Sequence, residues 1–341
     1  MKLTADAVGL WAAASLGAVA VFVLPAVAET FVLFDLTLFI VMSILALSLA
    51  LVWGFGGILA FGQSMFFGLG AYTYAVAVIN IGESTGPILL GIALPVLLAL
   101  LLGYFMFYGR VSNVYLGVIT LAVSLIFYYL IGATAGSEYR VGEALLGGFN
   151  GIPSVPPINV PGNPDIQVAY ERLYVLAAVI LTLVYFGLRG LLRSDFGRIV
   201  VSIRENETRA ELLGYDVRQY KLVVFAIGAG IAGLAGVLFC AWGAYVSPTV
   251  FSLGFTAQII MWILVGGLGT VVGPIVGCFL IQYLATWLGE TRIADVNLVL
   301  GVIFVVIVLF VRGGIVPMAA HVMAPLLSRL PVARPRDEAA A

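Results

Sequence analysis

Several side chains with hydrogen-bonding groups lie inside long apolar stretches of this 341-residue chain, and eight of them are selected as candidates. They are Gln63, Ser64, Tyr72, Thr73, Thr120, Ser124, Gln258 and Trp262. Polar groups at such positions are costly unless they face protein or water, so these eight are candidates for hydrogen bonds to a polar solute. Thr120 and Ser124 are four residues apart and share one helix face. Two alternatives stay open: Ser and Thr often bond back to their own helix, and Trp near a span end can be an interface anchor.

Catalysis by side chains is not indicated, because the sequence shows no nucleophile with a base and no cluster of metal ligands. The single histidine, His321, lies in the C-terminal tail. Cys240 and Cys278 lie in apolar stretches, where a cysteine is usually a small buried hydrophobic residue. The sequence therefore predicts no catalytic residue, no metal and no cofactor. An intramembrane enzyme is the weakest alternative.

The chain also lacks the residues that usually couple transport to an energy source. The only lysines are Lys2 and Lys221, and neither follows the glycine pattern of a phosphate-binding loop, so ATP is not bound in that way. The acidic residues Asp35, Glu290 and Asp295 lie at the ends of apolar stretches rather than deep inside them. A stand-alone secondary transporter usually needs an ionisable group or an ion site within the membrane, so it is a remote alternative.

The composition is that of a polytopic membrane protein. Hydrophobic residues make up 62% of the chain, charged residues make up 10%, and the mean hydropathy is +1.15. An ordinary soluble domain is about 25% charged, so a soluble fold would lack polar side chains to cover its surface. The net charge is −1 and no stripe of Lys and Arg occurs, so nucleic-acid binding is not expected.

The apolar stretches predict an all-α fold with about ten transmembrane helices. The first stretch resembles a signal peptide, but its length favours a span. The eighth and ninth are short and could instead form one re-entrant pair. Residues 132–172 are polar and rich in proline, which predicts an ordered but irregular loop. The stretches are residues 8–28, 34–53, 59–79, 88–108, 114–131, 173–192, 222–245, 255–272, 274–288 and 296–311.

Residues 193–221, called the charged segment below, contain 11 of the 33 charged side chains. Within the charged segment, residues 202–214 predict a short helix that Gly214 ends. It could be a solvated loop helix, or a helix that docks on a partner and transmits the partner's movement to the flanking spans. The candidate docking residues are Arg204, Glu205, Asn206, Glu207, Arg209, Ala210, Glu211 and Gly214.

The basic residues predict the orientation. If the charged segment is cytoplasmic, 13 of the 16 Lys and Arg residues lie on the cytoplasmic side, and only Arg140, Arg172 and Arg292 lie opposite. Membrane orientation follows this bias of Lys and Arg. The sequence therefore predicts both termini in the cytoplasm, with residues 132–172 on the other side and residues 316–341 as a cytoplasmic tail.

Three stretches carry motifs. Residues 194–239 contain a Gly-Arg, an Ile-Arg-Glu-Asn-Glu, an Ala-x-x-x-Gly and a Tyr-Lys-Leu at the start of the next helix. Residues 53–72 read WGFGGILAFGQSMFFGLGAY. Residues 266–277 read GGLGTVVGPIVG. Together they resemble the M-type permease subunits of branched-chain amino-acid ABC transporters. The GGFNGIP at residues 147–153 is similar to the family's outer-loop signature, but it is shorter and follows Leu146 where threonine is usual.

The resemblance covers most of the chain and identifies residues 1–315 as one permease domain of the bacterial inner membrane. It implies a homologous permease partner, in a hetero- or homodimer, two cytoplasmic ATPase subunits and a periplasmic solute-binding protein. It also implies that the helix near residues 202–214 couples to an ATPase. We further expect, from their polarity within apolar spans, that the eight polar residues line the solute pathway. The expected solute is a branched-chain amino acid. Urea or a short-chain amide is the alternative, because the proline-rich loop differs.

Overall fold

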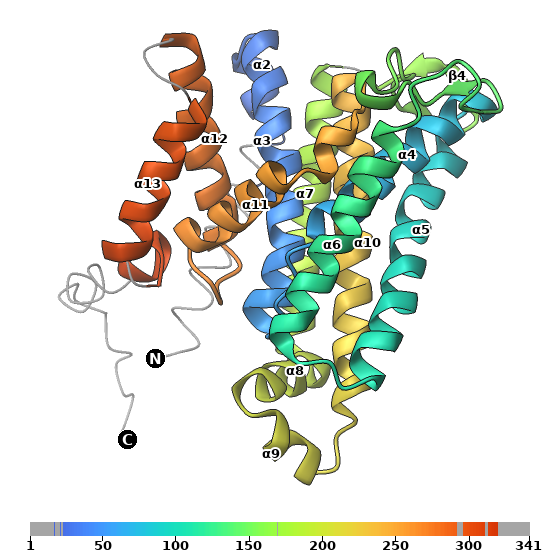
Figure 1. The fold of residues 1–341 in the computed structure, drawn as a ribbon. Helices are drawn as coiled ribbons and strands as arrows, with labels where there is room; N and C mark the ends of the chain where they lie inside the picture. Colours follow the sequence, from blue (N-terminus) through green and yellow to red (C-terminus); the bar gives the residue numbers. More distant parts are fainter. Residues whose placement is uncertain are drawn as a thin grey trace, which may run out of the picture.

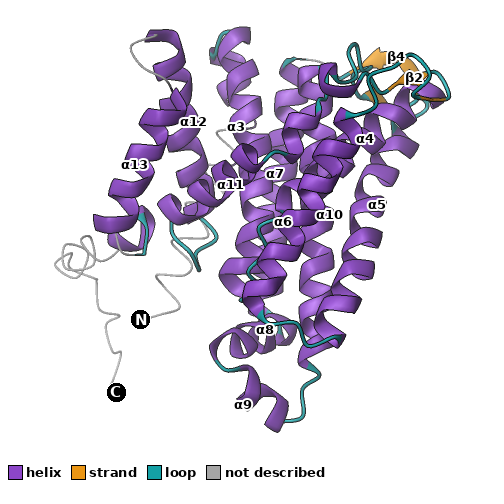
Figure 2. Cartoon of the chain, viewed as in Figure 1, coloured by secondary structure: helices purple, strands orange, loops and turns teal. Residues whose placement is uncertain are grey.

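The structure is a computed structural model that describes residues 17, 21, 23–168, 170–291, 296–310 and 313–319. Most of the predicted first span, together with Arg292, Asp295 and the tail that contains His321, lies outside these residues. The described chain is a bundle of long helices packed side by side, with two short helices at one end and short strands at the other (Figures 1 and 2). The predicted all-α membrane fold is confirmed.

Nine of the described helices match the predicted spans from the second to the tenth. Two of them, α3 and α5, continue as π-helical turns η2 and η3. In chain order the elements are α2 (Leu24–Val27), α3 (Thr30–Leu49), η2 (Ala50–Phe55), α4 (Gln63–Ile81), α5 (Thr85–Gly103), η3 (Tyr104–Tyr108), α6 (Asn113–Gly132), β1 (Arg140–Val141), β2 (Ala144–Leu145), η4 (Gly148–Asn150), β3 (Asn159–Val160), β4 (Asn163–Gln167), α7 (Glu171–Arg193), α8 (Asp195–Glu205), α9 (Glu207–Leu212), α10 (Val217–Gly243), η5 (Pro248–Phe251), α11 (Leu253–Gly266), α12 (Gly273–Thr291) and α13 (Val296–Phe310).

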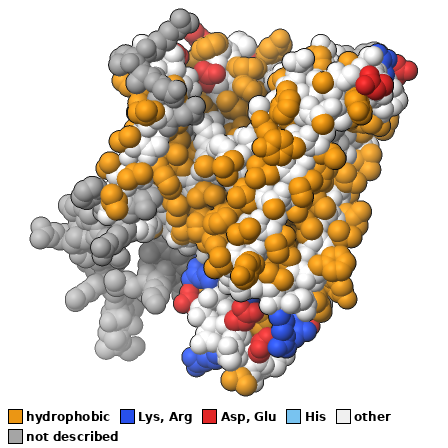
Figure 3. Space-filling view, in the orientation of Figure 1, with side chains coloured by type: hydrophobic (Ala, Val, Ile, Leu, Met, Phe, Trp, Pro, Cys, Tyr) orange, Lys and Arg blue, Asp and Glu red, His pale blue; other side chains and the backbone are white. Residues whose placement is uncertain are grey.

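Many large hydrophobic side chains of the helices are exposed. In Figure 3 hydrophobic side chains cover the middle of the visible face, and charged side chains gather at the end that carries α8 and α9. Six of the described helices, with their π-helical extensions, are long and apolar enough to cross a membrane: Thr30–Phe55, Gln63–Ile81, Thr85–Tyr108, Asn113–Gly132, Glu171–Arg193 and Val217–Gly243. This pattern is that of a multi-pass membrane protein.

The centre of the bundle is α10, which packs against α3, α4 and α5. Glycines bring the backbones together, since a Cβ atom on Gly70 of α4 would collide with the backbone of Gly233 of α10. Gly233 in turn lies against the carbonyl of Gly91 of α5. Close approach of small residues is the usual way in which helices associate in lipid, where no hydrophobic effect drives them together.

The structure describes the proline-rich loop (residues 132–172) except for residue 169. It contains two short antiparallel ribbons, β1–β2 and β3–β4, and is tied to the helix ends by side chains. Asn80, near the end of α4, donates to the Val141 carbonyl at 2.9 Å and accepts from the Glu143 amide at 2.8 Å. Ser84 and Asn159 form three hydrogen bonds. Each backbone amide donates to the other's side-chain oxygen, at 2.7 and 3.0 Å, and Ser84 Oγ donates to the Asn159 carbonyl at 3.1 Å.

The third predicted span does not begin as a helix. Residues 58–62 are not helical, and α4 starts only at Gln63. The amides of Phe61 and Gly62 each donate to Thr120 Oγ1 at 3.2 Å, so they do not need carbonyl partners within a helix. Gly62 lies against the backbone of Thr120, where a Cβ atom would collide. The predicted start of the helix at residue 59 is therefore wrong, because a side chain from α6 replaces the helical hydrogen bonds.

The eighth and ninth spans cross the bundle twice and do not form a re-entrant pair. Val246 pairs with Ile152 in the proline-rich loop, whereas Gly269, after α11, lies beside Gly54 near the charged segment. The chain then returns as α12 (Figure 1). The first of these crossings is helical only in its second part, because residues 246–252 form a bridge and the 3-10 turn η5 before α11 begins.

Replacement of Gly70 by alanine should destabilise the bundle. The added Cβ atom collides with the α10 backbone, and overpacking of this kind costs about 1–3 kcal/mol. The matched control is Gly187→Ala on α7, where a Cβ atom meets nothing within 4 Å and alanine has the better helix propensity. The midpoint of thermal unfolding in detergent should fall for Gly70→Ala only; equal midpoints would contradict the close α4–α10 contact.

Candidate functional site

Three hydroxyl groups from three helices meet inside the bundle. Ser64 Oγ of α4 lies 2.9 Å from Ser124 Oγ of α6 and 2.7 Å from Thr256 Oγ1 of α11. Ser124 Oγ also donates to the Phe251 carbonyl at 3.0 Å. All three hydroxyls are buried. We call Ser64, Ser124 and Thr256 the hydroxyl junction; it holds the beginning of α4 and the beginning of α11 against the same point of α6.

The predicted shared face of α6 is confirmed in its geometry. Thr120 lies one turn before Ser124, and its hydroxyl bonds back to the carbonyl of Leu116 at 2.9 Å or Gly117 at 3.0 Å. It accepts from the amides of Phe61 and Gly62 at the same time. Thr120 therefore contacts the non-helical residues 58–62 before α4, and Ser124 contacts Phe251 in residues 246–252 before α11.

Three of the eight predicted residues contain buried polar atoms without a partner in the described structure. Gln63 donates from Nε2 to Ser48 Oγ at 2.9 Å and to the Gly228 carbonyl at 3.1 Å, but its Oε1 has no partner. The Tyr72 hydroxyl and the Trp262 indole nitrogen are likewise buried and unpaired. Such atoms cost free energy unless a ligand or water reaches them, and so each needs an explanation.

The remaining predicted residues, Thr73 and Gln258, are half-buried and lie outside this hydrogen-bonded group. The structure adds two residues to it, Ser48 on α3 and Thr256 on α11. The signal that selected Ser64 could have found them, since both are polar residues within apolar stretches. Their contacts join residues that are 15 and 192 positions apart, which no local pattern can show.

The sequence predicted a single helix over residues 202–214, but the charged segment does not contain one. It forms two helices, α8 and α9, that part at Asn206, whose backbone is extended with φ −157°. Asn206 Oδ1 accepts from the Arg209 amide at 2.8 Å and caps α9. Asn is favoured at an N-cap because its side-chain oxygen satisfies a free amide, which explains the break. Gly214, with φ +90°, follows the end of α9.

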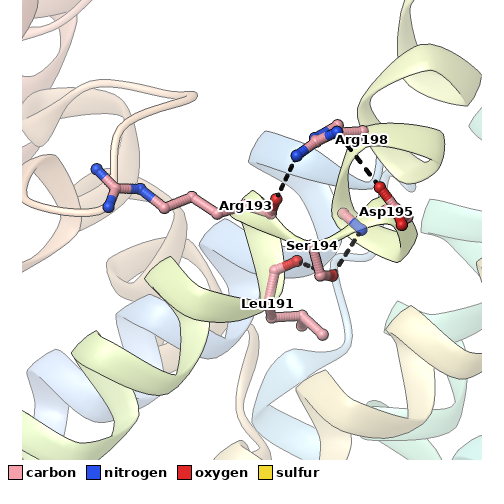
Figure 4. Close-up of polar contacts among 6 residues, drawn as sticks. Leu191, Arg193, Ser194, Asp195 and Arg198 are labelled. Carbon is pink, nitrogen blue, oxygen red and sulfur yellow. Dashed lines mark hydrogen bonds and ion pairs between the residues drawn. The ribbon is translucent and has the colours of Figure 1, made fainter. Parts of the chain in front are cut away.

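A tight turn joins α7 to α8 (Figure 4). Ser194 Oγ donates to the Leu191 carbonyl at 2.6 Å and accepts from the Gly197 amide at 3.3 Å. Arg198 folds back onto the Arg193 carbonyl at 3.2 Å and pairs with Asp195 at 3.3 Å. These local bonds fix the direction in which α8 leaves the last turn of α7.

Several predicted docking residues in fact hold the charged segment to the bundle. Arg204 Nη1 donates to the Gly54 carbonyl at 2.6 Å and its other nitrogen pairs with Glu205. Glu207 bonds Lys221 of α10 at 2.6 Å. Ala210 is buried between α8 and α10 in a small apolar cluster. The charged segment is thus fastened to η2 and α10 by side chains.

The outer surface of α9 is apolar at its end. Leu212 is 84% exposed and Leu213 is 70% exposed, beside the exposed Arg209 and Glu211. Sequence reasoning missed both leucines because it selected charged residues. Two adjacent leucines before a glycine in an otherwise charged helix were the available signal.

Comparison with known proteins decides the family. The profile described as "Branched-chain amino acid transport system / permease component" matches residues 31–311. The chain belongs to this permease family. It is 28% identical over 311 residues to the high-affinity branched-chain amino acid transport system permease protein LivM of Escherichia coli (strain K12), covering 83% of this chain and 69% of that protein. The predicted family is confirmed.

Two further relatives are more distant in sequence or coverage. A probable LivM of Methanocaldococcus jannaschii is 27% identical over 279 residues, 70% of this permease and 76% of the relative. The inner membrane ABC transporter permease protein YjfF of Escherichia coli (strain K12) is 25% identical over 150 residues, 42% of this permease and 45% of the relative. No solved structure matches the chain.

Replacement of Gln63 by alanine should destabilise the permease. The change leaves Ser48 Oγ and the Gly228 carbonyl without the amide donor, and buried polar groups that lose a partner cost about 1–3 kcal/mol. Gln258→Ala is the matched control, because Gln258 lies outside the hydrogen-bonded group. Thermal unfolding in detergent should separate the two variants; if their midpoints fall equally, the buried bonds of Gln63 contribute little.

Proposed function

We propose that this permease is the transmembrane subunit of an ABC importer that moves a branched-chain amino acid across the bacterial inner membrane. Two separate ATPase subunits supply the energy, a periplasmic binding protein delivers the solute, and a homologous permease completes the membrane pair. The observation that carries the proposal is the charged segment: two short helices project from the apolar bundle, are fixed to it by side chains, and end in exposed leucines. Family membership supports the same assignment.

The orientation rests on basic residues. Among the described residues, eight Lys and Arg side chains belong to the end with the charged segment, whereas Arg140 and Arg172 belong to the end with the proline-rich loop. Because cytoplasmic loops contain the excess of Lys and Arg, we assign the charged segment to the cytoplasm and the proline-rich loop to the periplasm. The eight are Arg110, Arg189, Arg193, Arg198, Arg204, Arg209, Arg218 and Lys221.

The exposed face of α9 is the proposed ATPase contact. Leu212 and Leu213 provide an apolar contact in a charged surrounding, and exposed apolar residues with a polar rim are typical of protein interfaces. Arg209 and Glu211 are the exposed charges beside them. A movement of α9 would reach the bundle through Arg204 and Lys221.

The eight polar residues remain the proposed lining of the solute pathway. The unpaired atoms of Gln63, Tyr72 and Trp262 support this proposal, because a polar solute or water could satisfy them. Ser64, Thr73, Thr120, Ser124 and Gln258 complete the set. The relatives named LivM support a branched-chain amino acid as the solute.

Transport should depend on the partner subunits. Proteoliposomes that contain this permease and the subunits encoded by neighbouring genes should accumulate leucine, isoleucine or valine only with internal access to ATP. Vesicles without the ATPase subunits are the control and should show no uptake. Uptake driven by an ion gradient in those vesicles would instead indicate a secondary transporter, and uptake of urea or a short-chain amide in place of the amino acids would correct the solute.

Replacement of both Leu212 and Leu213 by alanine should weaken coupling. Truncation of exposed apolar anchors at an interface costs about 2 kcal/mol or more, so solute-stimulated ATP hydrolysis should fall at least tenfold while unfolding is unchanged. The matched control replaces Leu89 and Leu90, an adjacent exposed pair on the membrane-spanning helix α5. Full stimulation in the Leu212/Leu213 variant would place the ATPase contact elsewhere.

A further inference from the structure

A cavity of about 260 Å³ lies beside the charged segment, between α9 and the turn that joins η3 to α6. The beginning of α10 lines it as well. Acidic and basic side chains lie close together at this end of the molecule in Figure 3. The cavity therefore has the proposed ATPase-contacting helix on one side and the end of the membrane-spanning bundle on the other.

Five charged side chains line the cavity, three basic and two acidic. Lys221 and Glu207 neutralise each other through the 2.6 Å bond that fastens α9 to α10. Arg218 lies over the Tyr108 ring, with its guanidinium carbon 5.9 Å from the ring centre. Within the part of the chain that the structure describes, the side chains of Arg110, Glu211 and Arg218 form no ion pair or hydrogen bond. Two guanidinium groups and one carboxylate beside the cavity are thus available to a ligand.

These charges suit a small zwitterion. The guanidinium groups of Arg110 and Arg218 can donate to a carboxylate, which arginine binds through paired N–H groups. Glu211 can accept from an ammonium group. Ser112, the N-cap of α6, also lines the cavity, and its side chain does not cap the first amides of the helix. Those amides are further donors for a carboxylate.

The remaining wall of the cavity is apolar. Phe107 at the end of η3 is buried, and Val111 in the turn before α6 is half-buried. The volume is below the roughly 300–1,000 Å³ of pockets that enclose drug-sized ligands, so the cavity suits a smaller molecule. A free aliphatic α-amino acid has the carboxylate, the ammonium group and the apolar side chain that these walls match.

We propose that this cavity binds the imported amino acid after its release into the cytoplasm and that the bound amino acid slows further import. The inference rests on the proposed function, whose orientation and solute it uses. The bound amino acid joins Glu211 of α9 and Arg218 of α10 to Arg110 in the turn before α6. It therefore favours the arrangement in which α9 lies against the bundle, and a ligand shifts a population toward the arrangement that it binds better. The cavity is thus a feedback site.

Binding is tested on the complete transporter in nanodiscs, without ATP and without the periplasmic binding protein. Equilibrium dialysis with labelled L-leucine counts the bound molecules. Replacement of both Arg110 and Arg218 by glutamine should remove one saturable leucine per copy of this permease. Arg140→Gln is the matched control, because Arg140 belongs to the opposite end of the bundle, and it should bind as many leucines as the parent. The same number bound in the double variant as in the parent, or no saturable binding to the parent, would overturn the site.

Analogues of leucine test the chemistry of the site. Leucinamide lacks the carboxylate and 4-methylpentanoate lacks the ammonium group, so each should compete for the arginine-dependent site about tenfold more weakly than leucine or worse. Inorganic phosphate, which has the charge of a free anion or of a lipid headgroup, should not displace leucine. Displacement by phosphate or by 4-methylpentanoate as effective as that by leucine would show an anion site instead of an amino-acid site.

Feedback is tested in proteoliposomes that contain the complete transporter and internal ATP. Internal L-leucine should lower the initial rate of isoleucine uptake about fivefold. Arg110→Gln should match the parent without internal leucine and keep that rate when leucine is present. This pattern distinguishes a lost feedback site from a structural defect, which would lower both rates. Equal inhibition of the parent and the variant would overturn the feedback role.

The experiments separate failure of this site from failure of the proposed function. If the parent complex shows no ATP-dependent uptake, the importer assignment is wrong, whereas the dialysis experiment, which needs no transport, still decides whether the cavity binds leucine. If uptake is normal and the double variant binds as much leucine as the parent, the importer assignment stands and the cavity is not an amino-acid site.

Discussion

Every backbone amide that leaves a helix inside a bilayer must find another partner, because lipid offers none. Residues 58–62 and 246–252 are not α-helical, and side chains of one helix, α6, satisfy this constraint there. Thr120 of α6 accepts from the amides of Phe61 and Gly62, and Ser124 donates to the Phe251 carbonyl. These bonds let residues 58–62 stay outside a helix and satisfy the Phe251 carbonyl at the end of the 3-10 turn η5. The course of α4 and α11 therefore depends on two small polar residues one turn apart.

Close backbone contacts hold α4 against α10 and α10 against α5. Gly70 lies against Gly233, Gly233 lies against the Gly91 carbonyl, and a Cβ atom added at any of these three glycines would collide. The molecule thus combines a close-packed unit around α10 with a hydroxyl-bonded seam along α6. Close packing reaches α6 as well, since Gly62 lies against the backbone of Thr120.

Hydropathy and motifs were sufficient for the fold class, for the approximate limits of the described spans and for the family. They could not locate the break in the helix at residues 58–62, because Ile58, Leu59 and Phe61 are as apolar as any helical residue. The partner of the Phe61 amide, Thr120, is 59 positions away. Charge was a poor guide within the charged segment for a related reason. Arg204 was selected as an exposed contact, yet its guanidinium reaches back to Gly54, 150 positions away. The residue types predicted which segments contain polar side chains, but tertiary contacts determine which groups those side chains bond.

The hydrogen bonds between Ser84 and Asn159 would affect how tightly another molecule binds the proline-rich loop. A loop of this length would normally lose much conformational freedom when another molecule settles on it, and that loss would be subtracted from the affinity. Here the loss has already been incurred on folding, because Asn159, Asn80 and Ile152 fasten the loop to the helices beneath it. A molecule that binds there would meet a surface that is already formed on the side of the permease, so its affinity would not be reduced by the ordering of the loop.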